Sequence, residues 1–490
     1  MSANDLLAVL PFLVVTVGGI ALLLIDLALS SEQKSVVAWL SIGTLVVAGL
    51  VALLQMNMRP FDAFYGMVRA DGYAFFLDAL LAAIGALAVL LALRYNEARG
   101  IMRGEFYALL LFSIGGMMLA GHATNLLTVF VAIELLSIPL YVLCGIARPR
   151  LESEESAMKY FLMGAFASGF LVYGIALVYG AAGTISLTEL SAILSAAGAR
   201  AYDPALLFAG VALILTGLGF KVAAAPFHMW TPDVYEGAPT TVTALMATAT
   251  KVAGFAAMLR VLLFGFQPLL PEWQPAVAGL AALTMIVGNV AALVQSNVKR
   301  MLAYSSIAHA GYVLVGIAAG GDLSTGSGGA SAVLFYLAAY AFTTLAAFAV
   351  MTAVGSGTEE NQTFDAYVGL GRRKPLLGLV MAVAMFSLIG IPPTAGFVGK
   401  YLLFGAAVAS GLTWLAVIGV LTSVISSYFY LRLVMTMFMR EPQAGGEPIH
   451  ASAPRSLAAA ISIAAVFVLG LLPAPLLDMI ITAGAQSTAR

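Results

Sequence analysis

About fourteen apolar runs recur along this chain, and most are long enough to cross a bilayer as a helix, which takes about 20 residues. In lipid, every backbone polar group needs a partner within the segment, so such runs form helices. Little sequence is left between them, which excludes a soluble catalytic domain. We expect an all-α polytopic membrane protein with helices over 6–29, 36–56, 73–93, 106–120, 123–147, 157–181, 204–230, 240–265, 276–294, 301–319, 330–354, 376–404, 412–440 and 455–482.

The amino-acid composition limits which cofactors the chain can bind. Hydrophobic residues make up 61% of the 490 residues, and charged residues only 10%. The single cysteine, Cys144, excludes internal disulfides, cysteine-ligated iron–sulfur clusters and zinc sites built from several cysteines. No glycine-rich nucleotide motif stands beside a strand–helix unit, and the 49 glycines favour close packing of membrane helices instead. We therefore expect this chain itself to bind no cofactor.

The basic residues indicate how the chain lies in the membrane. Met1 to Asp5 contain no basic segment and no cleavage site, so the first run is expected to be a retained helix. Cytoplasmic loops are enriched in Lys and Arg, so the richer set of alternating loops is expected to be cytoplasmic and both termini periplasmic. That set includes Lys34, Arg94, Arg148, Lys299, Arg300, Arg372 and Arg440. The other loops and the C-terminal tail hold only Arg59, Arg69, Arg200 and Arg490.

The seventh run leads into an unusual stretch, Lys221 to Pro239, which reads KVAAAPFHMWTPDVYEGAP. Pro226 and Pro232 lack a backbone N–H, so helical hydrogen bonding is expected to fail around both. Inside a bilayer such a break survives only within protein or beside a water-filled cavity, and a lysine there is costly. A cation, a broken helix and a histidine, His228, in one place indicate a pathway for ions or protons.

Two more ionisable residues stand at the centres of apolar runs, Glu134 in the fifth and Lys251 in the eighth. Glu134 cannot reach water, so it must pair, bind a proton or face a cavity. The alternative is a protonated glutamic acid that only hydrogen-bonds a neighbouring helix. Together with Lys221 these residues form an acid–base set, because burial and nearby charges tune their proton affinities. His228 titrates nearest to neutral pH and links them, unless it is a satisfied core histidine.

The second half of the chain shows similar features. His309 lies in the tenth run beside tyrosine and serine side chains that suit ordered water. The twelfth run breaks at 391–394, an Ile-Pro-Pro-Thr sequence, and Lys400 follows it. Arg432 stands near the cytoplasmic end of the thirteenth run, where snorkelling toward water and a functional role are both open.

Other charged residues are expected to be structural or solvated. Asp26 and Asp78 lie near helix ends, where they would cap a helix or face lipid headgroups. Arg260 lies near the outer end of its run and can snorkel to water. Glu154, in a loop of mixed charge, is expected to be solvated or to cap the next helix rather than to mark a proton entrance. The segment 183–203 is too polar to span and is expected to form a short interfacial helix.

The charged centres recur at nearly constant spacing. Positions 134 and 309 are 175 apart, 221 and 400 are 179 apart, and 251 and 432 are 181 apart. The broken seventh and twelfth helices fall onto each other at this offset of five helices. Because five is odd, the copies must lie inverted, which is a transporter design in which each copy supplies a half-channel. The chain then divides into 1–105 (helices 1–3), a first five-helix repeat over 106–266, a second over 267–440, and helix 14 with the tail over 441–490.

Two motifs carry a family resemblance. The stretch from Lys221 to Thr240 resembles the N-subunit family of bacterial proton-translocating NADH:quinone oxidoreductase, respiratory complex I. The stretch 299–312, KRMLAYSSIAHAGY, is shared more widely among antiporter-like subunits of complex I and multisubunit cation/proton antiporters, so it indicates only the superfamily. Helix number and length are similar to the N subunit along the whole chain. Lys400 also discriminates, because the related M subunit carries glutamate there.

This resemblance implies a role for each ionisable residue. Glu134 and Lys221 would form the controlling ion pair of the first half-channel. Lys251 and His309 would be central relays, and Lys400 would be the terminal proton donor. NADH, FMN, iron–sulfur clusters and quinone would be handled by partner subunits. The chain would lie in a bacterial inner membrane between neighbouring antiporter-like subunits, with no nucleic-acid partner.

Two other functions fit the same residues. One is a subunit of a multisubunit cation/proton antiporter with no link to NADH. The other is a structural spacer without a proton channel, whose charges only hold helices together.

Overall fold

The computed structural model describes residues 2–30, 33–196, 202–321, 328–354, 362–441, 449 and 452–488. Almost all of this part is helical, and thirteen of its helices are long and apolar enough to cross a membrane. Two shorter apolar helices, α16 (Pro375–Ile389) and α17 (Ala395–Ala409), occupy the place of the twelfth run. The expected all-α polytopic fold is confirmed. Arg200 and Arg490, two of the basic residues that indicate orientation, lie outside the described residues.

The N-terminal part consists of long helices and one small hairpin. Its elements are α1 (Ala3–Ala8), α2 (Leu10–Ala28), α3 (Ser35–Gln55), β1 (Phe61–Ala63), β2 (Val68–Ala70) and α4 (Gly72–Ala98). The sequence does not predict the hairpin, because strands of three residues are too short to show a recognisable alternation. The Phe64 N–H in the hairpin donates to the Asp5 carboxylate at 2.8 Å. That hydrogen bond lowers the pKa of Asp5 and fastens the hairpin to α1.

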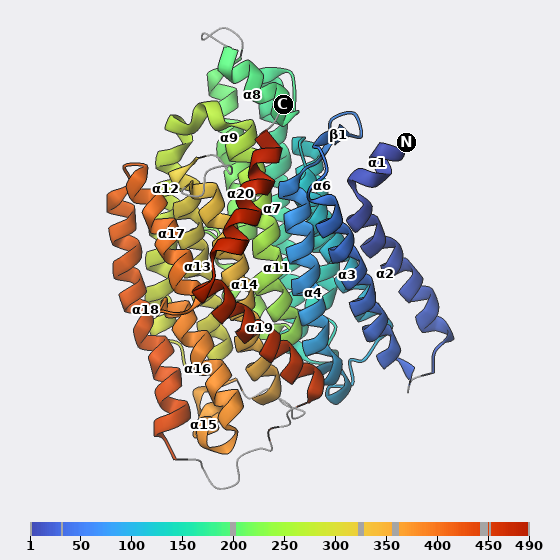
Figure 1. Ribbon diagram of the computed structural model, residues 1–490, viewed down its shortest axis with the longest axis vertical. Coiled ribbons are helices and arrows are strands. Elements are labelled where there is room, and N and C mark those ends of the chain that lie inside the picture. Colours follow the sequence, from blue (N-terminus) through green and yellow to red (C-terminus); the bar gives the residue numbers. More distant parts are fainter. Residues whose placement is uncertain are drawn as a thin grey trace.

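The next seven helices correspond to the first predicted repeat, although the first of them begins two residues before it. They are α5 (Gly104–His122), α6 (Leu126–Cys144), α7 (Leu151–Ala182), α8 (Leu187–Ala196), α9 (Pro204–Val222), α10 (Trp230–Gly237) and α11 (Thr240–Leu259), which continues as a π-helical turn, η2 (Arg260–Gly265). The short helix expected within 183–203 is α8, which lies at the end of the molecule that also carries β1 (Figure 1).

The remaining elements complete the bundle. They are η3 (Gln267–Leu269), α12 (Leu270–Leu293), α13 (Val298–Ala319), α14 (Gly329–Val354), η4 (Phe364–Tyr367), α15 (Leu370–Arg373), α16, α17, α18 (Thr413–Met439), α19 (Ala453–Leu471) and α20 (Ala474–Thr488). The single helix expected over 455–482 is wrong, because the chain leaves helical geometry at Leu472 and Pro473. Pro473 has no N–H to donate, and its ring disfavours a helical residue before it.

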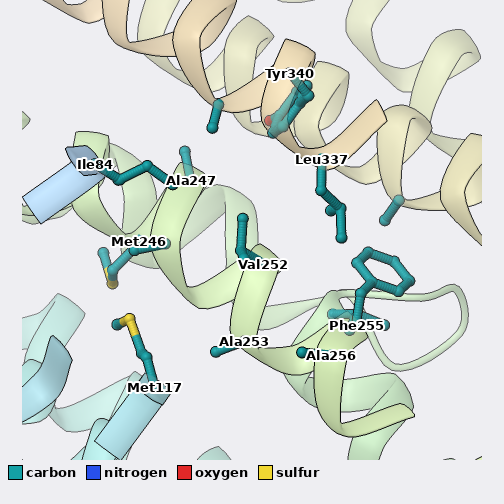
Figure 2. Packing of buried hydrophobic residues seen from close by; sticks show 14 of the residues in the cluster. Ile84, Met117, Met246, Ala247, Val252, Ala253, Phe255, Ala256, Leu337 and Tyr340 are labelled. Atoms are coloured by element: carbon teal, nitrogen blue, oxygen red, sulfur yellow. The ribbon is translucent and has the colours of Figure 1, made fainter. Parts of the chain in front are cut away.

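Helix α11 is the core of the molecule, and all its residues are buried. Figure 2 shows Ile84 of α4, Met117 of α5 and Leu337 of α14 among the apolar side chains around it. Helices α2 and α18 lie at opposite margins of the bundle in Figure 1 and expose apolar residues such as Leu27 and Val424. Their outer faces therefore suit lipid or another protein chain.

Two helices are interrupted near the expected positions. One break separates α9 from α10, and the other separates α16 from α17. The helix before each break ends on a residue in the left-handed region, Ala223 with φ 60° and Gly390 with φ 93°. The last carbonyl groups of such a helix lack helical partners beyond the cap, so they can accept hydrogen bonds from other parts of the chain.

The two prolines of the first break act differently. Pro226 lies in the non-helical segment 223–229, as its missing N–H predicts. Pro232 lies in the first turn of α10, where the N–H groups have no partner within the helix, so its missing N–H removes no helical hydrogen bond. The expectation that both prolines interrupt the helix is therefore wrong for Pro232.

The lysines stand on different sides of the two breaks. Lys221 belongs to α9 and precedes the first break, whereas Lys400 belongs to α17 and follows the second. The last residues before the breaks, at positions 222 and 389, are 167 apart, which is less than the 179 between the lysines. The breaks and the lysines thus do not share one register, and the inverted repeat stays a prediction.

Candidate functional site

Lys251 and Lys400 each bind a carbonyl that a helix break sets free. The Lys251 ammonium on α11 donates to the Val222 carbonyl at 2.9 Å, at the end of α9. The Lys400 ammonium on α17 donates to the Ile389 carbonyl at 2.9 Å, at the end of α16. Both lysines are buried, so a charged ammonium there needs such a partner. The carbonyl end of a helix also carries a partial negative charge that favours a cation.

Lys400 has further partners and stands beside a hollow. Its ammonium donates to Ser423 Oγ at 3.0 Å and lies 4.6 Å from the centre of the Tyr312 ring. An apolar hollow of about 1110 Å³ lies between α17 and α18, and Lys400, Tyr401 and Phe404 are among its lining residues. Tyr401 is largely exposed, so the hollow connects Lys400 to the surface of the chain.

Lys221 sits in an aromatic surround at the end of α9. Its ammonium donates to the Tyr160 hydroxyl at 3.4 Å and lies 5.1 Å and 5.8 Å from the ring centres of Tyr160 and Tyr141. Tyr160 in turn stacks on Trp230 of α10, with ring centres 4.7 Å apart. The Trp230 indole donates to the Phe220 carbonyl at 2.9 Å, which fixes α10 against α9. Aromatic faces stabilise a desolvated ammonium while leaving it chemically free.

Glu134 on α6 is half-buried and accepts a hydrogen bond from the Ser168 hydroxyl on α7. Among the described residues, Glu134 and Lys221 form no direct ion pair of the kind that the resemblance implies. Ser168 satisfies the carboxylate, and the Tyr141 and Tyr160 rings hold the ammonium. The two charges are therefore separate in this structure.

His309 on α13 is buried among tyrosines. Its Nδ1 and Nε2 atoms hydrogen-bond the hydroxyl groups of Tyr336 and Tyr430. The rings of Tyr312 and Tyr340 lie 5.4 Å and 5.0 Å from the His309 ring, measured between centres. Each ring nitrogen thus has a partner that can donate or accept, which is the requirement for passing a proton through imidazole.

Tyr312 connects His309 to Lys400. Its ring contacts both residues, and its hydroxyl accepts from Ser423 Oγ and from Asn289 Nδ2, each at 3.2 Å. Ser423 also accepts from the Lys400 ammonium. The structure thus brings together two of the predicted site residues in the second half of the chain, through a tyrosine and a serine that the sequence did not single out.

His228 is the predicted site residue that the structure does not join to the others. It lies half-buried in the segment 223–229, and its Nδ1 atom has no hydrogen-bond partner among the described residues. Within the described ranges, no hydrogen bond connects it to Lys221 or Lys251. Its predicted place as the link between them is therefore not made by direct contact.

A cluster of ion pairs that sequence reasoning missed joins α7, α10 and α13. Asp233 lies 2.8 Å from both the Lys159 ammonium and the Arg300 guanidinium. Glu236 lies 2.7 Å from Arg300. Both carboxylates belong to the stretch 221–239, but the sequence does not reveal their partners, because Lys159 and Arg300 lie 64 or more residues away.

A second unpredicted cluster is buried at the opposite end of α11. Arg260 donates to Asp71 at 2.6 Å and to the Gly121 carbonyl at 2.9 Å. His122 Nε2 lies 2.9 Å from Asp78 Oδ2, and both side chains are completely buried. The expectations that Arg260 snorkels and that Asp78 caps a helix or faces headgroups are wrong. Both residues are completely buried, and buried charges need partners within the protein.

The remaining charged residues have structural or solvated places. Asp26 pairs with Lys34 at 3.0 Å near the end of α2, and Glu154 is exposed. Arg432 donates to the Gln295 carbonyl at 3.2 Å, near the end of α12, so it has a partner in the protein and does not simply reach for water. Within the described part of the chain, no three His, Cys, Asp or Glu side chains gather where they could hold a metal ion.

Comparison with known proteins places these features in a family. A family model described as NADH:quinone oxidoreductase/Mrp antiporter, TM matches residues 123–426. NADH-quinone oxidoreductase subunit N of Chloroflexus aggregans and subunit N of Trichlorobacter lovleyi are each 46% identical to this chain. In both cases the match covers 97% of this chain and 96% of the relative.

Solved structures agree with the sequence relatives. A chain of respiratory complex I from Thermus thermophilus is 39% identical, with a TM-score of 0.78 over 96% of this chain and 98% of that chain. A chain of the Mrp complex from Dietzia sp. is 21% identical, with a TM-score of 0.84 over 99% of this chain and 97% of that chain. At that lower identity the likeness shows a shared fold only.

Proposed function

The chain belongs to the NADH-quinone oxidoreductase subunit N family, and from this premise we propose that it carries protons through the membrane arm of a proton-translocating NADH:quinone oxidoreductase. Protons cross on buried Glu, Lys and His side chains. Quinone reduction in partner subunits drives the transfer.

The proposal rests on one observation: two buried lysines donate hydrogen bonds to uncharged carbonyl groups. Lys251 and Lys400 donate to the ends of interrupted helices, and neither has a carboxylate partner among the described residues. A buried lysine paired with a carboxylate would leave an uncompensated charge when it lost its proton. A lysine held by a carbonyl or hydroxyl leaves none, so it can release and regain a proton without disrupting the fold.

We take the order of the groups from the family resemblance. Glu134 and Lys221 govern entry into the first half-channel, and Lys251 and His309 relay protons at the centre. Lys400 delivers them beside the hollow between α17 and α18. His228 takes part through water at its unpartnered Nδ1 atom.

Control of the relay is electrostatic. When the Glu134 carboxylate approaches Lys221, it stabilises the ammonium; when the two separate, the lysine gives up its proton more readily. Glu134 on Ser168 and Lys221 among tyrosines correspond to the separated arrangement. A charge change in a neighbouring subunit that closes or opens this pair would couple the subunits.

We infer the setting of the chain from its family and from its sequence. We assign NADH, FMN, the iron–sulfur clusters and quinone to partner subunits, and no redox centre to this chain. The chain lies in a bacterial inner membrane with both termini on the periplasmic side. The segments 106–266 and 267–440 form the inverted repeats, preceded by 1–105 and followed by 441–490. Both termini lie toward one end of the molecule in Figure 1, which supports an even number of crossings.

A subunit of a cation/proton antiporter is the second candidate, because the matching family model covers both classes and the Mrp chain shares the fold. Purification in mild detergent separates the two. Hydrophilic flavin and iron–sulfur subunits that travel with the chain favour the oxidoreductase, whereas small membrane subunits alone favour the antiporter.

Two substitutions test the proposed function directly. Lys221→Ala and Glu134→Ala are expected to lower quinone-coupled proton pumping by about tenfold or more, since each removes a group whose charge steers the proton. Lys374→Ala, at an exposed lysine before α16, is the control and is expected to pump normally. Near-normal pumping by assembled complexes with Lys221→Ala and Glu134→Ala would favour the structural spacer instead.

A further inference from the structure

The C-terminal segment α19–α20 spans both halves of the molecule. Helix α19 packs against α14, α17 and α4, and α20 packs against α4 and α14. In Figure 1 the two helices, drawn in dark red, cross the face of the bundle in different directions. The break at Leu472 and Pro473 permits this change of direction.

Near its end, α19 rests directly on the second helix break. A Cβ atom built on Gly470 would lie 2.1 Å from the Pro393 carbonyl oxygen and 2.6 Å from the Thr394 carbonyl carbon. Both atoms belong to the backbone, which cannot swing aside as a flexible side chain can. Any side chain at position 470 must therefore move the break itself.

The break that Gly470 touches sets the geometry of Lys400. It joins the end of α16, where Ile389 accepts the Lys400 hydrogen bond, to the start of α17, which carries Lys400. The break is a compact unit, since the Thr394 hydroxyl donates to the Ile391 carbonyl at 2.7 Å within it. A shift of this unit therefore changes the position of the Ile389 carbonyl relative to the ammonium.

A similar contact fixes α20, the part of the segment that follows Leu472 and Pro473. A Cβ atom built on Gly72, the first residue of α4, would lie 2.6 Å from the Cα atom of Ala483 in α20. Gly72 follows Asp71, which holds Arg260 at 2.6 Å. Arg260 opens η2, the continuation of α11, and α11 carries Lys251. The segment thus runs from the Lys400 site to the outer end of the helix that carries Lys251.

We infer that α19–α20 is a strap that holds the two lysine sites in a fixed relation, and that Gly470 is a positioning residue for the Lys400 site. This inference rests on the proposed function. It adds that a segment with no member of the proton relay sets the contact between Lys400 and the Ile389 carbonyl.

Gly470→Ala in the assembled complex tests the contact of the strap with the second helix break. The added Cβ must move from 2.1 Å to at least 3.0 Å from the Pro393 oxygen. We expect pumping per NADH oxidised to fall about tenfold or more, because displacements of about 1 Å at a reacting group have effects of this size. Gly279→Ala on α12 is the control, since its added Cβ meets nothing within 4 Å.

The pH profile of pumping separates positioning from general damage. Ser423→Ala removes a hydrogen bond from the same ammonium, so Gly470→Ala is expected to shift the profile in the same direction as Ser423→Ala. The titratable groups that face Lys400 are Tyr312 on α13 and, beyond it, His309 on the same helix. A lower rate with an unshifted profile would refute the positioning role.

Gly72→Ala tests the outer end, away from the relay. It pushes α20 from α4 and is expected to shift the same pH profile, by less than Gly470→Ala does. Gly85→Ala in the same helix is its control, because the atoms nearest to the added Cβ are side-chain atoms of Ile114 and Leu45, at 3.3 Å, rather than backbone atoms. If Gly470→Ala does not assemble, this variant decides.

Lys400→Ala distinguishes failure of the strap from failure of the proposed function. Loss of pumping in Lys400→Ala, together with normal pumping and a normal profile in Gly470→Ala and Gly72→Ala, would refute the strap and leave the function intact. Normal pumping in Lys400→Ala would refute the proposed function itself.

Discussion

Arg260 and Lys374 are both cations at ends of membrane-spanning helices, yet only Lys374 reaches water. Arg260 is completely buried, and it is held by the Asp71 carboxylate, the Gly121 carbonyl and the ring of Tyr73, whose centre lies 4.4 Å away. Three kinds of partner replace the water that a snorkelling arginine would have. A charge so enclosed depends on its counter-ion much more than an exposed one does.

Asp71→Ala is expected to destabilise the chain by about 3–5 kcal/mol, because it leaves the Arg260 guanidinium buried without its carboxylate. Loss of the Asp71 cap on the Ala74 N–H of α4, a hydrogen bond of 2.9 Å, adds about 1 kcal/mol. Replacing both charges, with Asp71→Leu and Arg260→Met, is expected to recover most of the stability. Thermal unfolding of the purified complex measures these effects. Asp62→Ala, at an exposed carboxylate, is the control. Equal unfolding temperatures for Asp62→Ala and Asp71→Ala would show that the buried Arg260 does not depend on Asp71.

At the scale of elements, proline content predicts the two helix breaks to within a few residues, because a missing N–H is a local property. The partners of the breaks are not local. The Val222 carbonyl binds a lysine 29 residues away, and Arg260 binds a carboxylate 189 residues away. Such pairs depend on which helices pack together, and no single apolar run encodes that. The residues of the proposed relay were therefore predictable by type, whereas their contacts, and the lack of a contact between His228 and the other members, were not.

The helices before the two breaks end on different residue types in the left-handed region, Ala223 after α9 and Gly390 after α16. Gly390→Ala is expected to destabilise the end of α16 by about 1–2 kcal/mol, since a residue with a Cβ is strained at φ 93°. The added Cβ would also lie 3.1 Å from Lys400 Cδ, so pumping is expected to fall. Ala223→Gly, the reverse exchange at the end of α9, is expected to leave stability and pumping nearly unchanged. Unfolding and pumping assays on both variants check this, and a harmless Gly390→Ala would contradict it.

At the scale of the whole molecule, two different sets of ion pairs lie near the two ends of α11. Near its start, Asp233, Glu236 and Arg300 form partly exposed ion pairs between α10 and α13. Beyond its end, the pair of Arg260 and Asp71 is sealed from water. Exposed pairs contribute little and weaken in salt, whereas buried pairs break at a high cost. The end of α11 near Arg260 is therefore expected to be the more rigid one, and it is the end that the sequence predicts to lie on the periplasmic side.

Thiol labelling tests that orientation. The chain contains a single cysteine, Cys144, which is buried, so the background from the natural protein is low. Cysteines introduced by Tyr65→Cys, in the fully exposed hairpin turn, and by Lys374→Cys, before α16, are expected to lie on opposite faces of the membrane. A membrane-impermeant reagent added to intact cells after removal of the outer barrier should modify Tyr65→Cys and spare Lys374→Cys, whereas inverted vesicles should give the reverse. This follows because Lys374 lies in one of the loops rich in Lys and Arg, and such loops stay in the cytoplasm. Labelling of Lys374→Cys in intact cells and of Tyr65→Cys in inverted vesicles would show that the chain has the opposite orientation in the membrane.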